Sequence, residues 1–168
     1  MKSKNISMFA LYTALAFIFS YIESLLPLPF PVPGMKLGLA NIIIVVVLYK
    51  NGFPQAIAIS IIRTMLTALT FGNLFMLLFS LVGTTLSLLG MSLIKRFTKC
   101  SIISVSALGG VLHNIGQILV AILVLRSTTI LSYLPILYFT GLVSGVLMGI
   151  LSYECIRRLP THVLNSMN

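Results

Sequence analysis

The feature that most limits the fold of this chain is a succession of long apolar runs. Six of them occur, at about residues 6–26, 36–49, 54–71, 73–93, 102–125 and 133–153. A helix of about 20 such residues crosses the hydrocarbon core of a bilayer. Charged residues make up only 8% of the chain, against about 25% in soluble domains. The sequence therefore predicts an all-α integral membrane protein, with six transmembrane helices in a single domain over residues 1–168.

The second run, at residues 36–49, is shorter than the others. With a rise of about 1.5 Å per residue, a helix of this length does not cross a core of about 30 Å. The stretch before it, "LPLPFPVPG", has proline at every second position from Pro27 to Pro33, which predicts a stiff, extended chain. Either this stretch completes the crossing, or the short helix lies in a thinned or protein-lined region.

The positions of lysine and arginine predict the orientation, because cytoplasmic loops are enriched in these residues. With a cytoplasmic N-terminus and six spans, both termini are cytoplasmic, and the inner side carries Lys2, Lys4, Lys50, Lys95, Arg96, Lys99, Arg157 and Arg158. The outer side then carries only Lys36 and Arg126. This strong bias predicts a multi-pass protein of the cell membrane with both ends inside.

Charge and composition exclude several other functions. The net charge of +9 is typical of nucleic-acid binding in a soluble protein, but here the basic residues fall between apolar runs. Cys100 and Cys155 lie near predicted inner helix ends, so we expect no disulfide, and two cysteines with two histidines match no metal-site spacing. Neither a G-x-S-x-G nor an H-E-x-x-H motif occurs. We expect no cofactor, no metal and no enzymatic activity.

Ionisable residues inside membranes are costly and usually face protein or water. Arg63 lies near the middle of the third run, and Ser60, Thr67 and Thr70 extend a polar stripe from it. Glu23 lies at the outer end of the first run and Lys36 before the second. One interpretation is a structural ion pair of Glu23 with Arg63 or Lys36. The other is that these charges line a ligand-binding pocket, and the two are compatible.

Further polar groups follow in the motifs "PGMKLGLAN" and "GGVLHNIGQ". The first places Asn41 about a turn and a half beyond Lys36, and the second places His113, Asn114 and Gln117 within about one turn of the fifth run. Hydrogen bonds between helices are one explanation for such residues. Because three of them occur together, we favour a polar ligand-binding cavity to which Asn41 also contributes.

Small residues predict where helices approach closely. Gly141, Gly145 and Gly149 recur every four residues in the last run and predict a tight helix contact. Ala10 and Ala14 form an A-x-x-x-A pair in the first run, about 160° around the helix from Glu23. The polar face of this helix therefore points into the bundle, which leaves the small face for a partner helix or for lipid.

The motifs "ALYTA", "PGMKLGLAN", "IIRTMLTALTFG", "FSLVGTTLSLLGM", "ALGGVLHNIGQ" and "YLP" together resemble one family over nearly the whole chain. It is the Gx transporter family, also described as heptaprenyl diphosphate synthase component I. That family is similar to the substrate-binding S components of energy-coupling factor (ECF) transporters. The resemblance implies an S-component-like bundle that binds a vitamin-like molecule from outside. It also implies docking on a transmembrane T component through the face of Ala10 and Ala14, with ATP-hydrolysing subunits as further partners.

The resemblance leaves two functions open. As a transport subunit, the chain would bind a small vitamin-like or anionic metabolite, for example a flavin-like one, through Glu23, Lys36, Asn41, Arg63, His113, Asn114 and Gln117. The alternative is a non-catalytic membrane component in heptaprenyl diphosphate or isoprenoid quinone biosynthesis. Prenyl synthases hold Mg²⁺ and diphosphate with clustered aspartates, and this chain has none, because its two acidic residues are Glu23 and Glu154. Catalysis by this chain is therefore not expected under either function.

Overall fold

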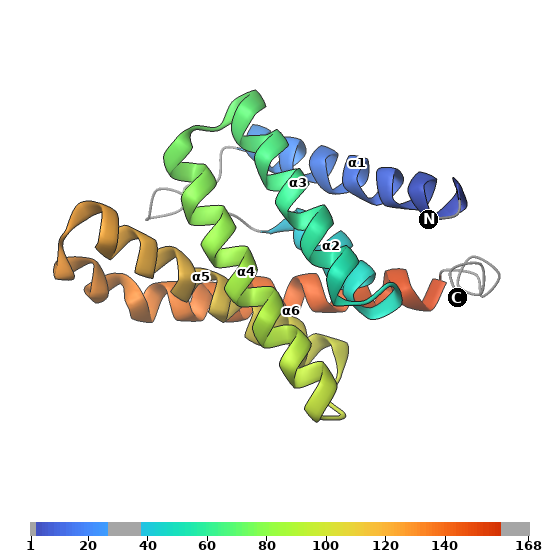
Figure 1. Ribbon diagram of the computed structural model, residues 1–168. Coiled ribbons are helices and arrows are strands. Elements are labelled where there is room, and N and C mark those ends of the chain that lie inside the picture. The colour runs from blue at the N-terminus through green and yellow to red at the C-terminus, as the bar shows by residue number, and fades with distance from the viewer. Residues whose placement is uncertain (1–2, 27–37, 159–168) are drawn as a thin grey trace.

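The computed structural model describes residues 3–26 and 38–158. All regular elements in these ranges are helical: α1 (Ser3–Leu25), α2 (Leu39–Lys50), α3 (Phe53–Phe71), α4 (Leu74–Phe97), α5 (Ile102–Leu125), the 3₁₀ helix η1 (Thr128–Tyr133) and α6 (Leu134–Arg158) (Figure 1). Within the described ranges, five of the helices are long and apolar enough to cross a membrane. The prediction of an all-helical membrane protein is therefore confirmed. The number of crossings and the orientation stay predictions.

α2 is the short helix that the sequence predicts, with 12 residues and a length of about 18 Å. It contacts α1, α3 and α6, and its residues from Ile44 to Leu48 are all buried. A helix that is apolar on all sides is stable when other helices surround it. α2 is thus an internal helix, and its shortness is compatible with a position inside the bundle. The proline-rich stretch before α2, from Pro27 to Pro33, lies outside the described residues.

Local chemistry explains where several helices begin and end. The Asn73 side chain accepts a hydrogen bond of 2.8 Å from the Met76 backbone N–H at the start of α4, and Ser101 caps α5 in the same way. α4 and α6 continue a few residues beyond the predicted ends, to Phe97 and Arg158. Both extensions contain basic side chains in the last helical turn, where a positive charge is favourable.

Glycines allow α5 to pack closely against its two neighbours. A Cβ atom on Gly145 of α6 would lie 2.6 Å from the Ser106 carbonyl oxygen and 2.8 Å from Ala107 Cα of α5. On the other side of α5, a Cβ on Gly116 would lie 2.7 Å from Gly83 Cα of α4. Only glycine fits at such distances, so the predicted role of the Gly141, Gly145 and Gly149 series in helix contact is confirmed.

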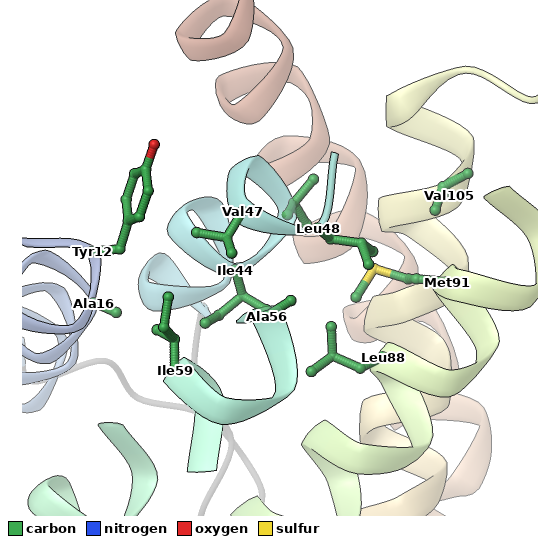
Figure 2. Close-up of a cluster of buried hydrophobic side chains, with 11 residues drawn as sticks. Tyr12, Ala16, Ile44, Val47, Leu48, Ala56, Ile59, Leu88, Met91 and Val105 are labelled. Carbon is green, nitrogen blue, oxygen red and sulfur yellow. The ribbon is translucent and has the colours of Figure 1, made fainter. Parts of the chain in front are cut away.

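An apolar cluster joins the first half of the chain to the second. Figure 2 shows Tyr12 and Ala16 of α1 on one side, Leu88, Met91 and Val105 on the other, and side chains of α2 and α3 between them. The residues of α2 and α3 in this cluster are Ile44, Val45, Val47, Leu48, Ala56 and Ile59. Helices in a bilayer gain stability from such packing rather than from removal of apolar surface from water.

The helix ends define two sides of the bundle. On one side, the Lys95 ammonium group of α4 donates a 2.7 Å hydrogen bond to the Leu48 carbonyl oxygen of α2 and lies 4.8 Å from the centre of the Tyr49 ring. The start of α1 and the end of α6 lie close together at the right of Figure 1. On the opposite side, the end of α1 meets the end of α3, where the Tyr21 and Phe71 rings are 5.6 Å apart.

Candidate functional site

A layer of polar side chains lies next to the apolar cluster, toward the side where α1 and α3 end. In α1, Ser20 lies one turn beyond Ala16 of the cluster. In α3, Arg63 lies one turn beyond Ile59, and in the antiparallel α4, Thr84 lies one turn before Leu88. Because the cluster fixes the register of these helices, the polar groups of at least three helices lie at a similar height.

Arg63 connects α3 to α1. Its Nη1 donates a hydrogen bond of 3.1 Å to the Ser20 hydroxyl oxygen. The Glu23 carboxylate, one turn further along α1, is close enough for its negative charge to stabilise the positive charge of the guanidinium. The Nε of Arg63 is buried and has no hydrogen-bond partner among the described residues. The charge of Arg63 is thus compensated, but its hydrogen-bonding capacity is only partly used.

Glu23 also fixes the start of α2. Its carboxylate oxygen accepts a hydrogen bond of 2.5 Å from the Gly38 backbone N–H. Gly38 is in the left-handed conformation, with φ of 82°, which favours glycine. A Cβ on Gly38 would lie 2.9 Å from Nδ2 of Asn41, so the Asn41 side chain folds back over this glycine. Glu23 is therefore linked both to the start of α2 and to Arg63 of α3.

Four hydroxyl groups of the layer are buried without a hydrogen-bond partner among the residues that the structure describes. They belong to Ser60, Thr64 and Thr67 of α3 and Thr84 of α4, which are 1%, 3%, 8% and 5% exposed. An unpaired buried polar group costs roughly 1–3 kcal/mol. Several such groups at neighbouring positions are therefore unfavourable, and any group that pairs with them, such as one on a bound molecule, removes this cost.

The polar residues of α5 lie in different surroundings. Asn114 donates a hydrogen bond of 2.7 Å from Nδ2 to the Leu137 carbonyl oxygen of α6. His113 packs on α4, since a Cβ on Gly83 would lie 3.1 Å from His113 Nδ1. Gln117 is half-buried one turn later. Asn114 thus joins α5 to α6, whereas His113 lies against Gly83 of α4.

The predicted site residues are therefore only partly brought together. A hydrogen bond links Glu23 to Gly38, the Glu23 charge acts on Arg63, and Asn41 lies against Gly38. Lys36 lies outside the described residues. Thr70, predicted to extend the stripe of Arg63, is exposed, and its hydroxyl donates to the Leu66 carbonyl oxygen of its own helix. The sequence interpretation did not include Ser20, Thr64 and Thr84 among the site residues, although the four-residue spacing of Ser60 and Thr64 is a usable signal.

The structure also shows which face of α1 is exposed. Ala10 and Ala14 are both exposed, and Ser20 and Glu23 on the opposite face are buried. The predicted division of α1 into a small exposed face and a polar inner face agrees with this arrangement. Among the described residues, no group of three metal-ligating side chains lies together, and Cys100 and Cys155 are free thiols.

Comparison with known proteins assigns the chain to a family. The family model described as heptaprenyl diphosphate synthase component I matches residues 12–155. The chain belongs to this family. The match includes Ser20, Glu23, Arg63 and Thr84, so the polar layer lies within the part of the chain that defines this component I family. No curated protein and no solved structure matches the chain. The resemblance to the component I family is thus confirmed.

Proposed function

We propose that this component I protein is a membrane-embedded substrate-binding subunit, similar to the S components of ECF transporters. In this role it binds a small vitamin-like or anionic metabolite, for example a flavin-like one, and does not itself hydrolyse ATP. The binding groups are those of the polar layer, with Arg63 at its centre. The predicted partners are a transmembrane T component and ATP-hydrolysing subunits.

The observation that carries the proposal is the buried polar layer. Arg63 lies in a helix that is long and apolar enough to span the membrane, and its Nε and the hydroxyl of Thr64 have no hydrogen-bond partner among the described residues. Polar and ionisable groups inside a membrane usually have a function because their burial is unfavourable. A stable helix bundle needs no unpaired groups at this position, whereas a ligand site does.

Two further features support the transport role. The basic residues Lys50, Lys95, Arg96, Arg157 and Arg158 occupy the last turns of α2, α4 and α6. By the positive-inside rule this side is cytoplasmic, so the polar layer is nearer the outer side. Ala10 and Ala14 are exposed on α1, where an S component resembling this chain docks on its T component.

A second function is supported by the family description itself. As one component of a prenyl diphosphate synthase, the chain would be a membrane partner of a soluble enzyme. The chain contains no aspartate, and diphosphate-bound Mg²⁺ requires clustered oxygen ligands. Under this alternative the catalytic metal site therefore belongs to the soluble partner, and this chain provides membrane attachment.

Purification from native membranes in a mild detergent distinguishes the two functions. We expect T and ATPase subunits to co-purify, and mass spectrometry to detect a small molecule released on denaturation. Arg63→Ala should lose that molecule while it still inserts and elutes as a single species, whereas the matched control Arg126→Ala should retain it. Co-purification of a soluble prenyl synthase without ATPases supports the alternative. Full retention of the molecule by Arg63→Ala shows that Arg63 is structural.

A further inference from the structure

Four buried hydroxyl groups of the polar layer have no hydrogen-bond partner among the described residues. We infer that Ser60, Thr64, Thr67 and Thr84 bind a molecule with at most one negative charge that offers both hydrogen-bond donors and acceptors, such as amide or hydroxyl groups. A diphosphate does not fit this description. The inference rests on the proposed function, because it requires that the polar layer holds a small molecule.

The Tyr49 hydroxyl is also buried without a partner among the described residues, but the four hydroxyl groups of the layer differ from most hydrogen-bonded serine and threonine side chains of these helices. Most other serine and threonine side chains whose bonds are known donate to a carbonyl oxygen three or four residues earlier: Thr13, Ser20, Ser24, Thr70, Thr98, Thr140, Ser144 and Ser152. This is the usual way in which a hydroxyl is satisfied inside an apolar helix. The hydroxyls of Ser60, Thr64, Thr67 and Thr84 lack such a bond, although each is within a helix.

The four groups also lie around one part of the bundle. Ser60, Thr64, Thr67 and Arg63 fall within an arc of about 100° on α3. Arg63 is at the edge of this arc toward α1, where it bonds to Ser20, and Thr64 is at the other edge. Thr84 is one turn before Leu88, which packs in the same cluster as Ile59 of α3. The hydroxyls of the two helices therefore lie next to the same apolar cluster.

The charges of the layer argue against a polyanion. Away from the helix ends, Arg63 is the only cationic side chain in the part of the chain that the structure describes. Glu23 already stabilises its charge. A diphosphate brings at least two negative charges, and among the described residues of the layer it would meet one guanidinium that already has an acidic neighbour, which is unfavourable in a medium of low dielectric constant. A neutral or singly charged ligand avoids this cost.

The hydrogen-bonding character of hydroxyl groups supports the same class. A serine or threonine hydroxyl donates one hydrogen bond and accepts others, whereas the oxygen atoms of an ionised phosphate only accept. Hydroxyl groups can donate to a phosphate, but phosphate sites in proteins usually add backbone N–H groups, arginine or lysine. Four hydroxyls beside Ile59 and Leu88 instead match a molecule with mixed donors and acceptors and an apolar flank.

The test compares Thr64→Val and Thr84→Val with Thr70→Val, a matched control whose hydroxyl is exposed and bonds within its own helix. Native mass spectrometry of protein from native membranes measures the bound fraction of the co-purifying molecule and its mass. We expect a neutral or singly charged molecule on wild type and on Thr70→Val, with about tenfold weaker retention in the two other variants. After the molecule has been removed, these variants should melt at the same temperature as wild type or higher, because each loses an unpaired buried group.

The outcomes separate the failure of this inference from the failure of the proposed function. Two results would overturn the ligand class but not the proposed binding function. One is a phosphorylated polyanion bound to wild type. The other is thermal stabilisation of wild type by added farnesyl diphosphate that is lost in Arg63→Ala. Equal retention by Thr64→Val, Thr84→Val and Thr70→Val overturns the assignment of the hydroxyls. Lower melting temperatures of the stripped Thr64→Val and Thr84→Val proteins also contradict it, because the hydroxyls then stabilise the fold. If wild type carries no small molecule at all, both the inference and the proposed function are wrong.

Discussion

The guanidinium of Arg63 lies 3.1 Å from the hydroxyl of Ser20, across the interface between α3 and α1. The Ser20 hydroxyl itself donates to the Ala16 carbonyl oxygen at 3.0 Å, so its lone pairs are directed at Arg63. This arrangement gives the one cation in the middle of α3 a defined position. It also means that Ser20 provides a direct hydrogen bond between α1 and α3 within the polar layer.

Replacement of Ser20 by alanine should therefore destabilise the protein. The change leaves an Nη1 donor of Arg63 buried without a partner, which costs roughly 1–3 kcal/mol. The measurement is unfolding of the purified protein by increasing amounts of an anionic detergent. Ser24→Ala is the matched control, because the Ser24 hydroxyl is exposed and bonds only to the Tyr21 carbonyl oxygen of its own helix. Equal stability of both variants would show that the Ser20–Arg63 bond contributes nothing.

Glu23 and Arg63 should behave as a coupled pair. Glu23→Gln keeps an acceptor for the Gly38 N–H but removes the charge that stabilises the guanidinium. Arg63→Gln leaves the carboxylate without its counter-charge. We expect each single variant to have a lower free energy of unfolding than wild type. The loss in the double variant should be smaller than the sum of the two single losses by roughly 0.5–3 kcal/mol. Strict additivity in the same detergent-unfolding assay contradicts the coupling.

The crossing of α5 and α6 should tolerate no side chain at Gly145. A Cβ there meets the backbone of α5 at Ser106 and Ala107, which cannot move aside without separating the helices. Gly145→Ala should thus cost about 1–3 kcal/mol. Gly90→Ala is the control in α4, because its Cβ meets first the end of the Leu112 side chain, which can rotate away. A loss for Gly90→Ala as large as that for Gly145→Ala contradicts this explanation.

Much of this architecture follows from the sequence alone. The lengths of the apolar runs predict the helices, because a bilayer accepts only backbone that is hydrogen-bonded internally. The glycine series of α6 predicts a close contact, and the structure shows that α5 is the helix it contacts. The shortness of α2 is also evident from the sequence, which predicts a run of residues 36–49, although the helix itself is Leu39–Lys50.

The polar layer is less accessible to sequence reasoning. Helical spacing places Ser60 and Thr67 on the face of Arg63, but the same reasoning includes Thr70, which is exposed. The partner of Arg63 depends on which helix lies beside α3, and the chain does not encode this in any local pattern. Whether a hydroxyl bonds to its own helix or stays unpaired depends on its rotamer. Thr64 and Thr84 therefore become notable only in the folded structure.

Asn114 should be structural rather than a ligand-binding residue. Its Nδ2 donates to the Leu137 carbonyl oxygen of α6 at 2.7 Å, and a hydrogen bond between membrane helices contributes on average about 0.6 kcal/mol and at most about 1.7 kcal/mol. Asn114→Ala should lower stability by an amount in this range and leave the co-purifying molecule in place. Loss of the molecule without loss of stability, measured by mass spectrometry and detergent unfolding, contradicts this assignment.

The orientation can be tested with the two native cysteines, which are both exposed. Cys100 follows α4 and Cys155 lies in the last turns of α6, so both are on the side with the basic helix ends. With cytoplasmic termini, a membrane-impermeant maleimide should label neither thiol in intact cells, and should label both in inverted vesicles. Asn73→Cys, in a variant that lacks the two native cysteines, is the control, because the exposed Asn73 lies between α3 and α4 on the opposite side. It should react only from outside. Labelling of Cys100 in intact cells together with protection of Asn73→Cys would show the opposite orientation. The polar layer would then lie nearer the cytoplasm, where a subunit for uptake from outside would not receive its ligand.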